Sequence, residues 1–134
     1  MKPILISIFV FGIISLKSYG DVPVKFSTDV EEFARAVENN ERVLVDFSAH
    51  WWGTCQALVK GVWNNDDFQN VAMDKDIKLF YIDFDIHKDL LEKYEVKTIP
   101  TWKFINGPTN EIETNTGLAP LKTVLKKIND YFID

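Results

Sequence analysis

The chain has 134 residues, a single cysteine and a formal net charge of −5, from 15 basic and 20 acidic side chains. An acidic chain without a basic stripe is not expected to bind nucleic acid or an anionic membrane surface. One cysteine cannot form an internal disulfide, so the fold must be held together by its hydrophobic core.

The first twenty residues have the pattern of a secretory signal peptide. Lys2 supplies a positive charge, Ile4–Leu16 is a nearly continuous apolar run, and the small residues Ser18 and Gly20 precede the expected cleavage site. The run is short for a membrane span, and an uncleaved N-terminal anchor is the alternative. We expect an exported protein, periplasmic or secreted, with one domain over residues 21–134 and no stable membrane insertion after cleavage.

Apolar residues alternate or run together in segments that predict strands, and recur at helical spacing in others. In chain order we expect strand Val22–Phe26, a helix from a Ser27 or Thr28 cap to Asn39, strand Arg42–Ala49, helix Cys55–Lys60, helix Asp67–Met73, strand Ile77–Phe84, helix His87–Tyr94, strand Thr101–Ile105, a turn at Asn106-Gly107-Pro108, strand Glu111–Thr116 and helix Pro120–Phe132. This order predicts the α/β class, with a central mixed sheet flanked by helices on both faces.

Two helices carry more detailed expectations. The first helix is expected to bury Phe33, Ala34 and Val37 along one apolar face. Gly61 is expected to weaken the helix that begins at Cys55, because glycine lowers helix stability.

The turn Trp51–Cys55 is the most informative segment, because it joins a buried strand to a helix. Sites in open α/β sheets form where strand carboxyl ends meet helix N-termini. Two cysteines separated by two residues would make a dithiol–disulfide site here. Trp52 stands where the first cysteine would be, and only Cys55 remains. Disulfide exchange starts from an attacking thiolate, so dithiol turnover within this one chain is excluded.

These segments together resemble the thioredoxin superfamily. Val43–Trp51 is similar to the strand that leads into the family's active site, and Glu95–Trp102 resembles the segment with the cis-proline facing that site. Asn106-Gly107 and Gly117 match the turn and the later glycine of the terminal hairpin. The resemblance implies a thioredoxin fold across nearly the whole mature chain.

A narrower resemblance concerns Gly61–Phe68. This segment looks like that of the exported thioredoxin-like group, which includes the C-terminal domain of the bacterial membrane disulfide reductase DsbD. It favours a periplasmic location.

The resemblance also implies roles for single residues. Cys55 holds the family's resolving position, and Asp46 matches the buried acid that moves a proton to or from that cysteine. The alternative for Asp46 is an inherited strand residue without a redox role. Pro100 resembles the cis-proline of the peptide groove, and Ile99 before it would offer backbone groups to an extended peptide. The alternative for Pro100 is a purely structural role.

The remaining positions of the turn depart from the family pattern. Thr54 replaces the usual proline and is expected to cap the following helix, and Gln56 replaces the usual basic residue. Trp51 and Trp52 are expected to be exposed and to line the groove, because exposed tryptophans are favoured anchors at binding surfaces.

Other candidate residues have simpler interpretations. Trp63 and Trp102 are expected in the core, and His87 is expected to cap a helix or face solvent. His50 and Cys55 are too few for a metal site, so no metal or cofactor is expected.

Three functions remain open from the sequence. The favoured one is a redox-inactive module that holds an extended polypeptide non-covalently in the groove. The second is a monothiol oxidoreductase or redox sensor that uses Cys55 and Asp46 and forms mixed disulfides with a protein thiol or disulfide partner, with glutathione, or with a second copy in a Cys55-linked dimer. The third is a structural role with Cys55 buried and inert.

Overall fold

The computed structural model describes residues 22–107 and 109–134, so the predicted signal peptide and Pro108 lie outside the described part. Within it, one sheet has the strand order β2-β1-β3-β4. Its strands are β1 (Arg42–Ser48), β2 (Ile77–Asp83), β3 (Thr101–Asn106) and β4 (Glu111–Thr116). Strands β1 and β2 are parallel, whereas β3 is antiparallel to both β1 and β4. The predicted mixed sheet is therefore confirmed.

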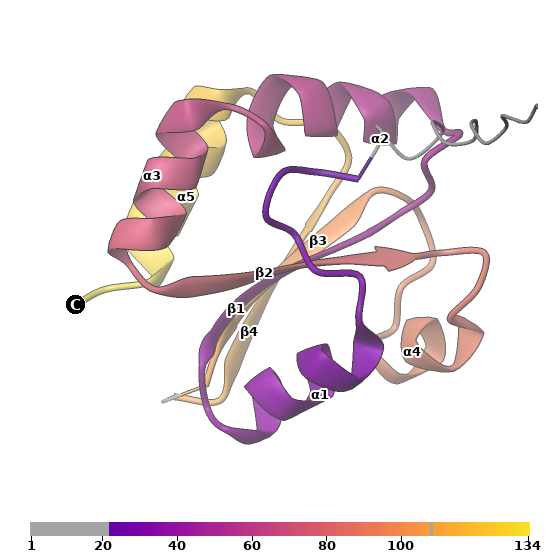
Figure 1. Cartoon of the computed structure of the whole chain (residues 1–134), viewed down its shortest axis with the longest axis horizontal. Coiled ribbons are helices and arrows are strands. Elements are labelled where there is room, and N and C mark those ends of the chain that lie inside the picture. The colour runs from indigo at the N-terminus through magenta and orange to yellow at the C-terminus, as the bar shows by residue number, and fades with distance from the viewer. Residues whose placement is uncertain (1–21, 108) are drawn as a thin grey trace, which may run out of the picture.

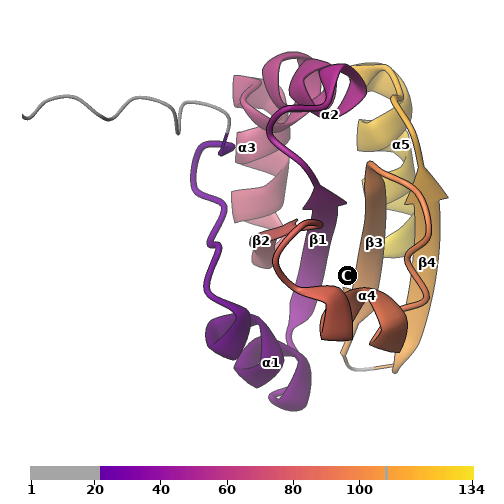
Figure 2. The same cartoon turned by 90° about the vertical axis from the view of Figure 1, so that its right-hand side faces the viewer.

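Helices cover both faces of this sheet, as predicted (Figure 1). The helical elements are α1 (Val30–Glu38), α2 (Gly53–Leu58), the π-helical turn η2 (Val59–Trp63), α3 (Asp66–Asp74), α4 (Lys88–Lys93) and α5 (Leu121–Tyr131). Figure 2 shows α2, α3 and α5 on one side of the sheet and α1 and α4 on the other. Most boundaries differ from the predicted ones by one or two residues, as helix and strand ends commonly do.

Two hydrophobic clusters form the core, one on each face of the sheet. Successive side chains of a strand point to opposite faces. Val43, Val45 and Phe47 of β1 therefore pack towards α1 and α4. Leu44 packs towards α2, α3 and α5, in the same cluster as Trp63. Trp63 and Trp102 are both buried, which confirms their predicted place in the core.

The first helix begins later than predicted, because Asp29 is its cap. The Asp29 carboxylate accepts hydrogen bonds from the backbone N–H groups of Glu31 at 2.9 Å and Glu32 at 3.2 Å. The helix buries Phe33 and Ala36. The prediction that Ala34 faces the core was wrong, since Ala34 is exposed.

The predicted strand Val22–Phe26 is not formed. Pro23 accepts a hydrogen bond from Phe26 N–H in a turn, and Lys25 has a left-handed φ of 62°. Both features bend the chain away from the extended conformation that a ladder needs. A single bridge, from Ser27 to Phe80 of β2, is the only β-type pairing in this stretch.

Helix α2 also differs from its predicted form. It begins at Gly53 with Trp52 as the N-cap residue and without a capping side chain, so Thr54 lies inside the helix and is not the cap. Gly61 does not end the helical path, because η2 follows α2 directly. Asn64 N–H donates to Val59 C=O at 2.9 Å, the five-residue spacing of a π-helix.

The turn between β3 and β4 requires a glycine at position 107, directly after β3. A side chain at Gly107 would overlap the backbone of Asn40, and Gly107 N–H donates to Glu41 C=O at 3.2 Å. The hairpin is therefore anchored against the loop that precedes β1.

Candidate functional site

The turn Trp51–Cys55 leaves the carboxyl end of β1. The register of β1 with β3 pairs Phe47 with Thr101, so the residues just before β3 lie at the same end of the sheet. These residues form the Ile99–Pro100 bond, which is cis as the sequence predicted. Ile99 is half-buried and Pro100 is buried. The fold thus brings the predicted groove residues to one end of the sheet.

The two adjacent tryptophans form an exposed aromatic surface at this end. Trp51 is 54% and Trp52 45% exposed, so both are on the surface as expected. Their rings meet edge to face, with centroids 5.6 Å apart. The Trp51 indole N–H donates to the Asp85 carboxylate at 2.6 Å, which ties the turn to the loop after β2. The sequence offered no sign of this partner.

Cys55 lies in the first turn of α2 and has no exposed surface. Burial raises the pKa of its thiol, and the neighbouring Asp46 charge raises it further. Hydrogen bonds with the Ser48 side chain and the Ala49 backbone lower the pKa only in part. The thiol is therefore mainly protonated near neutral pH, and a protonated thiol is a poor nucleophile.

The carboxyl group of Asp46 is fully buried and accepts two hydrogen bonds. Ser48 Oγ donates to Oδ1 at 2.6 Å and Trp63 Nε1 donates to Oδ2 at 2.8 Å. Burial raises the pKa of Asp46 to about 7, although both hydrogen bonds act to lower it. The Ser48 hydroxyl thus donates to Asp46 and also acts on the Cys55 thiol, whose pKa it lowers.

Ser48 and Trp63 are the two members of this network that the sequence did not reveal. Ser48 lies two residues after Asp46 and so on the same face of β1, a relation that could have suggested the contact. Trp63 is brought to Asp46 from η2, and nothing in the sequence pattern links those two positions.

The two histidines lie outside the network of Asp46, Ser48 and Trp63. His50 is exposed, and its backbone C=O accepts from the Gln56 side chain at 2.7 Å. His87 is the N-cap residue of α4 but its side chain makes no capping hydrogen bond.

Two features are absent from residues 22–107 and 109–134. No group of three or more histidine, cysteine, aspartate and glutamate side chains in this part could hold a metal ion. No helix in this part is both long and apolar enough to cross a membrane.

Comparison with known proteins identifies the family. Residues 24–130 match the thioredoxin family. The chain belongs to this family. It is 31% identical over 109 residues to a thioredoxin of Ictalurus punctatus, which covers 77% of this chain and 94% of the relative. It is 33% identical over 79 residues to a thioredoxin of Mycoplasmoides gallisepticum, covering 58% of this chain and 73% of the relative.

The chain is also similar to longer proteins. It is 36% identical over 78 residues to a protein disulfide-isomerase of Drosophila melanogaster, a match that covers 58% of this chain but only 16% of that protein. It therefore corresponds to a small part of such relatives. Together these matches show a thioredoxin-fold protein related to thiol–disulfide oxidoreductases.

Solved structures agree on the fold. A thioredoxin of Plasmodium falciparum superposes with a TM-score of 0.62 at 24% identity, covering 81% of this chain and 99% of that one. Mitochondrial thioredoxin 3 of Saccharomyces cerevisiae superposes with a TM-score of 0.60 at 22% identity, covering 80% and 94%. At this level of identity the likeness concerns the fold alone.

Proposed function

We propose that this protein is an exported thioredoxin-family member that does not turn over disulfides and instead binds an extended polypeptide non-covalently. The binding surface would comprise Trp51, Trp52, Ile99 and Pro100. One observation carries the proposal: Cys55 is the only thiol of the chain and has no exposed surface, while the N-cap position of α2 is occupied by Trp52.

The chemistry of disulfide exchange supports this reading of the site. The reaction needs a thiolate that can reach a disulfide sulfur of the partner. At the start of α2 the accessible group is the Trp52 indole, which cannot form such a bond. The Cys55 thiol, three residues further on, is buried and has a raised pKa. Exposed aromatic rings are instead suited to bury apolar side chains of a partner.

Export is the second part of the proposal. It is supported by the apolar run Ile4–Leu16 after Lys2 and by the small residues before Asp21. The resemblance of Gly61–Phe68 to the group that includes the C-terminal domain of DsbD supports a periplasmic site of action.

A second function is favoured by the buried network. Ser48 donates to Asp46 and also acts on the Cys55 thiol, so the Ser48 hydroxyl offers a route by which Asp46 could take the thiol proton. If the first turn of α2 opened, the Cys55 thiolate could attack a protein or glutathione disulfide, form a mixed disulfide and release the other sulfur as a thiolate. An external thiol would then have to reduce the mixed disulfide, since the chain has no second cysteine.

The binding proposal can be tested with a polypeptide that has no free thiol. The reduced and alkylated insulin B chain, labelled with a fluorophore, is a suitable probe because it cannot form a covalent adduct. The Trp52→Ala variant should bind it about tenfold or more weakly than wild type, as expected for an aromatic anchor. The control is Ile112→Ala on β4, which changes a similarly exposed apolar side chain elsewhere and should not alter the affinity. Equal affinity of wild type and Trp52→Ala would remove Trp52 from the binding surface.

A turnover assay tests the redox part separately. With dithiothreitol as reductant, the wild-type protein should not accelerate the reduction of insulin disulfides above the uncatalysed rate. Acceleration that disappears in Cys55→Ser would instead establish the monothiol function.

A further inference from the structure

The outer edge of β2 is a second candidate binding surface, because backbone N–H and C=O groups of this strand face away from the sheet. Strand β2 is the outermost strand on its side of the sheet. Within residues 22–107 and 109–134, the segment before α1 pairs with this edge only at Ser27, whose N–H donates to Leu79 C=O and whose C=O accepts from Tyr81 N–H, both at 2.9 Å. The surface lies away from the turn Trp51–Cys55, which follows the opposite, carboxyl end of the strands.

Leu79 N–H, next to this bridge, has no acceptor among the described residues. The N–H and C=O of a strand residue point to the same side, so Leu79 N–H faces the same edge as its C=O. If the parallel ladder continued beyond Ser27, Leu79 N–H would donate to Lys25 C=O. The left-handed turn at Lys25 removes that acceptor, and no other described residue accepts from Leu79 N–H. Ile77, two residues earlier, presents its N–H and C=O to the same open edge.

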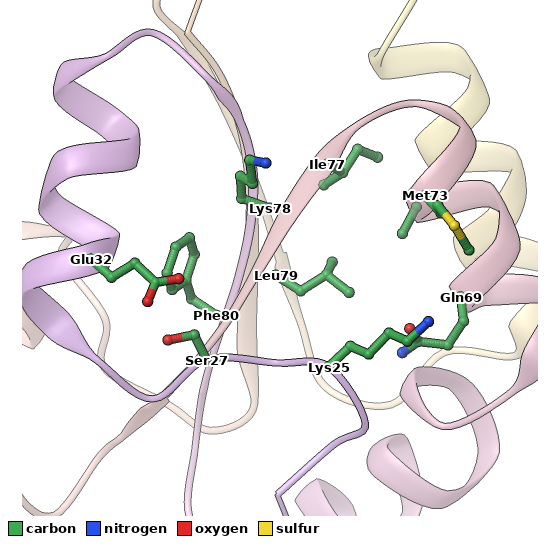
Figure 3. Close-up of a pocket in the computed structure, with 10 residues that line it drawn as sticks. Lys25, Ser27, Glu32, Gln69, Met73, Ile77, Lys78, Leu79 and Phe80 are labelled. Carbon is green, nitrogen blue, oxygen red and sulfur yellow. The ribbon is translucent and has the colours of Figure 1, made fainter.

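Depressions lie on both sides of this edge. One of about 250 Å³ lies mainly between β2 and α3, where it is lined by Lys25, Gln69, Ala72, Met73, Ile77 and Leu79, and it extends across the edge to Glu32 and Phe80 (Figure 3). Another of about 210 Å³ lies towards α1 and includes Glu32, Arg35, Lys78 and Phe80. A strand added to β2 would direct alternate side chains towards these two depressions.

The α3-side depression specifies what such a strand should carry. Its walls are mostly apolar, and Met73 is 61% exposed there. Lys25 lies at one end and forms no ion pair with any described residue, whereas Lys78 already contacts Glu41 and Asp76. Neighbouring side chains on the same face of a strand are two residues apart. An added strand could therefore place an apolar residue against Met73 and an acidic residue, two positions away, next to Lys25. Glu32 lies on the α1 side of the edge, where it would face the residue of the added strand that stands between the apolar and the acidic one.

We infer that the β2 edge, where among the described residues Leu79 N–H has no acceptor and Lys25 no ion-pair partner, binds an extended polypeptide as an additional strand, with an apolar residue and a carboxylate two positions apart. This mode of binding uses main-chain hydrogen bonds for affinity and side-chain pockets for selectivity. The inference is independent of the groove at Trp51 and Trp52.

The test is an NMR titration of the uniformly ¹⁵N-labelled full chain. The probe is the capped hexapeptide Thr-Thr-Val-Thr-Asp-Thr, and the matched probe has Asn in place of Asp. In the free protein Leu79 N–H should exchange rapidly with solvent. The acidic probe should bind with a Kd below about 1 mM, shift the amide signals of Ile77 and Leu79, and slow the exchange of Leu79 N–H.

Three exposed positions supply the variants. Met73→Glu should abolish binding. Lys25→Glu should weaken binding of the Asp probe roughly two- to fivefold and leave the Asn probe unaffected, as expected for one surface ion pair. Ile112→Glu, on the opposite edge strand β4, is the control and should bind like wild type.

Several results would overturn the inference. One is a Leu79 amide that is already protected in the free protein, because residues 1–21 or a second copy would then cover the edge. Others are the absence of signal changes on β2, changes confined to Trp51 and Trp52, or equal weakening of both probes by Lys25→Glu.

Discussion

At the scale of single residues, the buried carboxyl group of Asp46 has the largest electrostatic consequence. Its pKa is raised to about 7 in the folded protein, whereas its ordinary value is 3.8. Between those values the unfolded chain loses the proton while the folded protein keeps it. The contribution of Asp46 to stability is therefore complete below pH 3.8 and is lost as the pH rises through about 7.

This sign leads to a prediction for Asp46→Asn. The free energy of unfolding of wild type should fall by on the order of 1 kcal/mol per pH unit between about pH 5 and pH 7, and the variant should lack this slope. Urea denaturation at several pH values measures it. The exposed Asp67→Asn variant is the control and should keep the wild-type slope. A slope that survives in Asp46→Asn would assign it to another group.

The reactivity of Cys55 is the second prediction at this scale. Iodoacetamide at neutral pH should label the native thiol at least about a hundredfold more slowly than the thiol in denaturant, because the group is buried and its pKa is raised. Mass spectrometry over time gives both rates. Rapid labelling of the native protein would contradict a buried, inert thiol and strengthen the monothiol alternative, including a Cys55-linked dimer.

At the scale of elements, the β3–β4 hairpin depends on close contact between two backbones. Gly107→Ala should lower the free energy of unfolding by roughly 1–3 kcal/mol, because the added methyl group would overlap Asn40. Gly61→Ala is the matched control, since a side chain there meets nothing within 4 Å. Thermal melting of the two variants separates the effects. Equal melting temperatures would show that the hairpin can shift away from Asn40 without loss of stability.

Most elements could be predicted because their apolar periodicity decides them. The continuous apolar run of Arg42–Ala49 predicted β1, which is buried along nearly its whole length, and the alternation of Glu111–Thr116 predicted β4. The segment Val22–Phe26 was misjudged because periodicity does not show that Lys25 adopts a left-handed conformation. The beginning of α2 was misplaced because Trp52 occupies the N-cap position without a capping side chain.

The site was predicted less completely than the fold. Cys55, Asp46 and the cis bond before Pro100 follow from short sequence segments and their resemblance to the family. The contacts of Trp63 with Asp46 and of Trp51 with Asp85 join positions 17 and 34 residues apart. Such contacts arise from the packing of whole elements, which local sequence does not encode.

At the scale of the whole molecule, the proposed export would decide where any partner is met. When the full chain is expressed in a Gram-negative bacterium, we expect a periplasmic protein whose N-terminal residue is Asp21. Cell fractionation and N-terminal sequencing provide the measurement. Recovery of the uncut chain from the membrane would support the N-terminal anchor, and recovery from the cytoplasm would contradict export.

The π-helical turn η2 has a consequence for how chain length can vary in this family. A π-helical turn holds one residue more than an α-helical turn. The chain could therefore lose one residue between Leu58 and Asn64, and the turn would become α-helical while α2 and α3 keep their places. Alignments of more distant relatives should open a one-residue gap here, and a chain without that residue should aim the aromatic ring equivalent to Trp63 in a different direction.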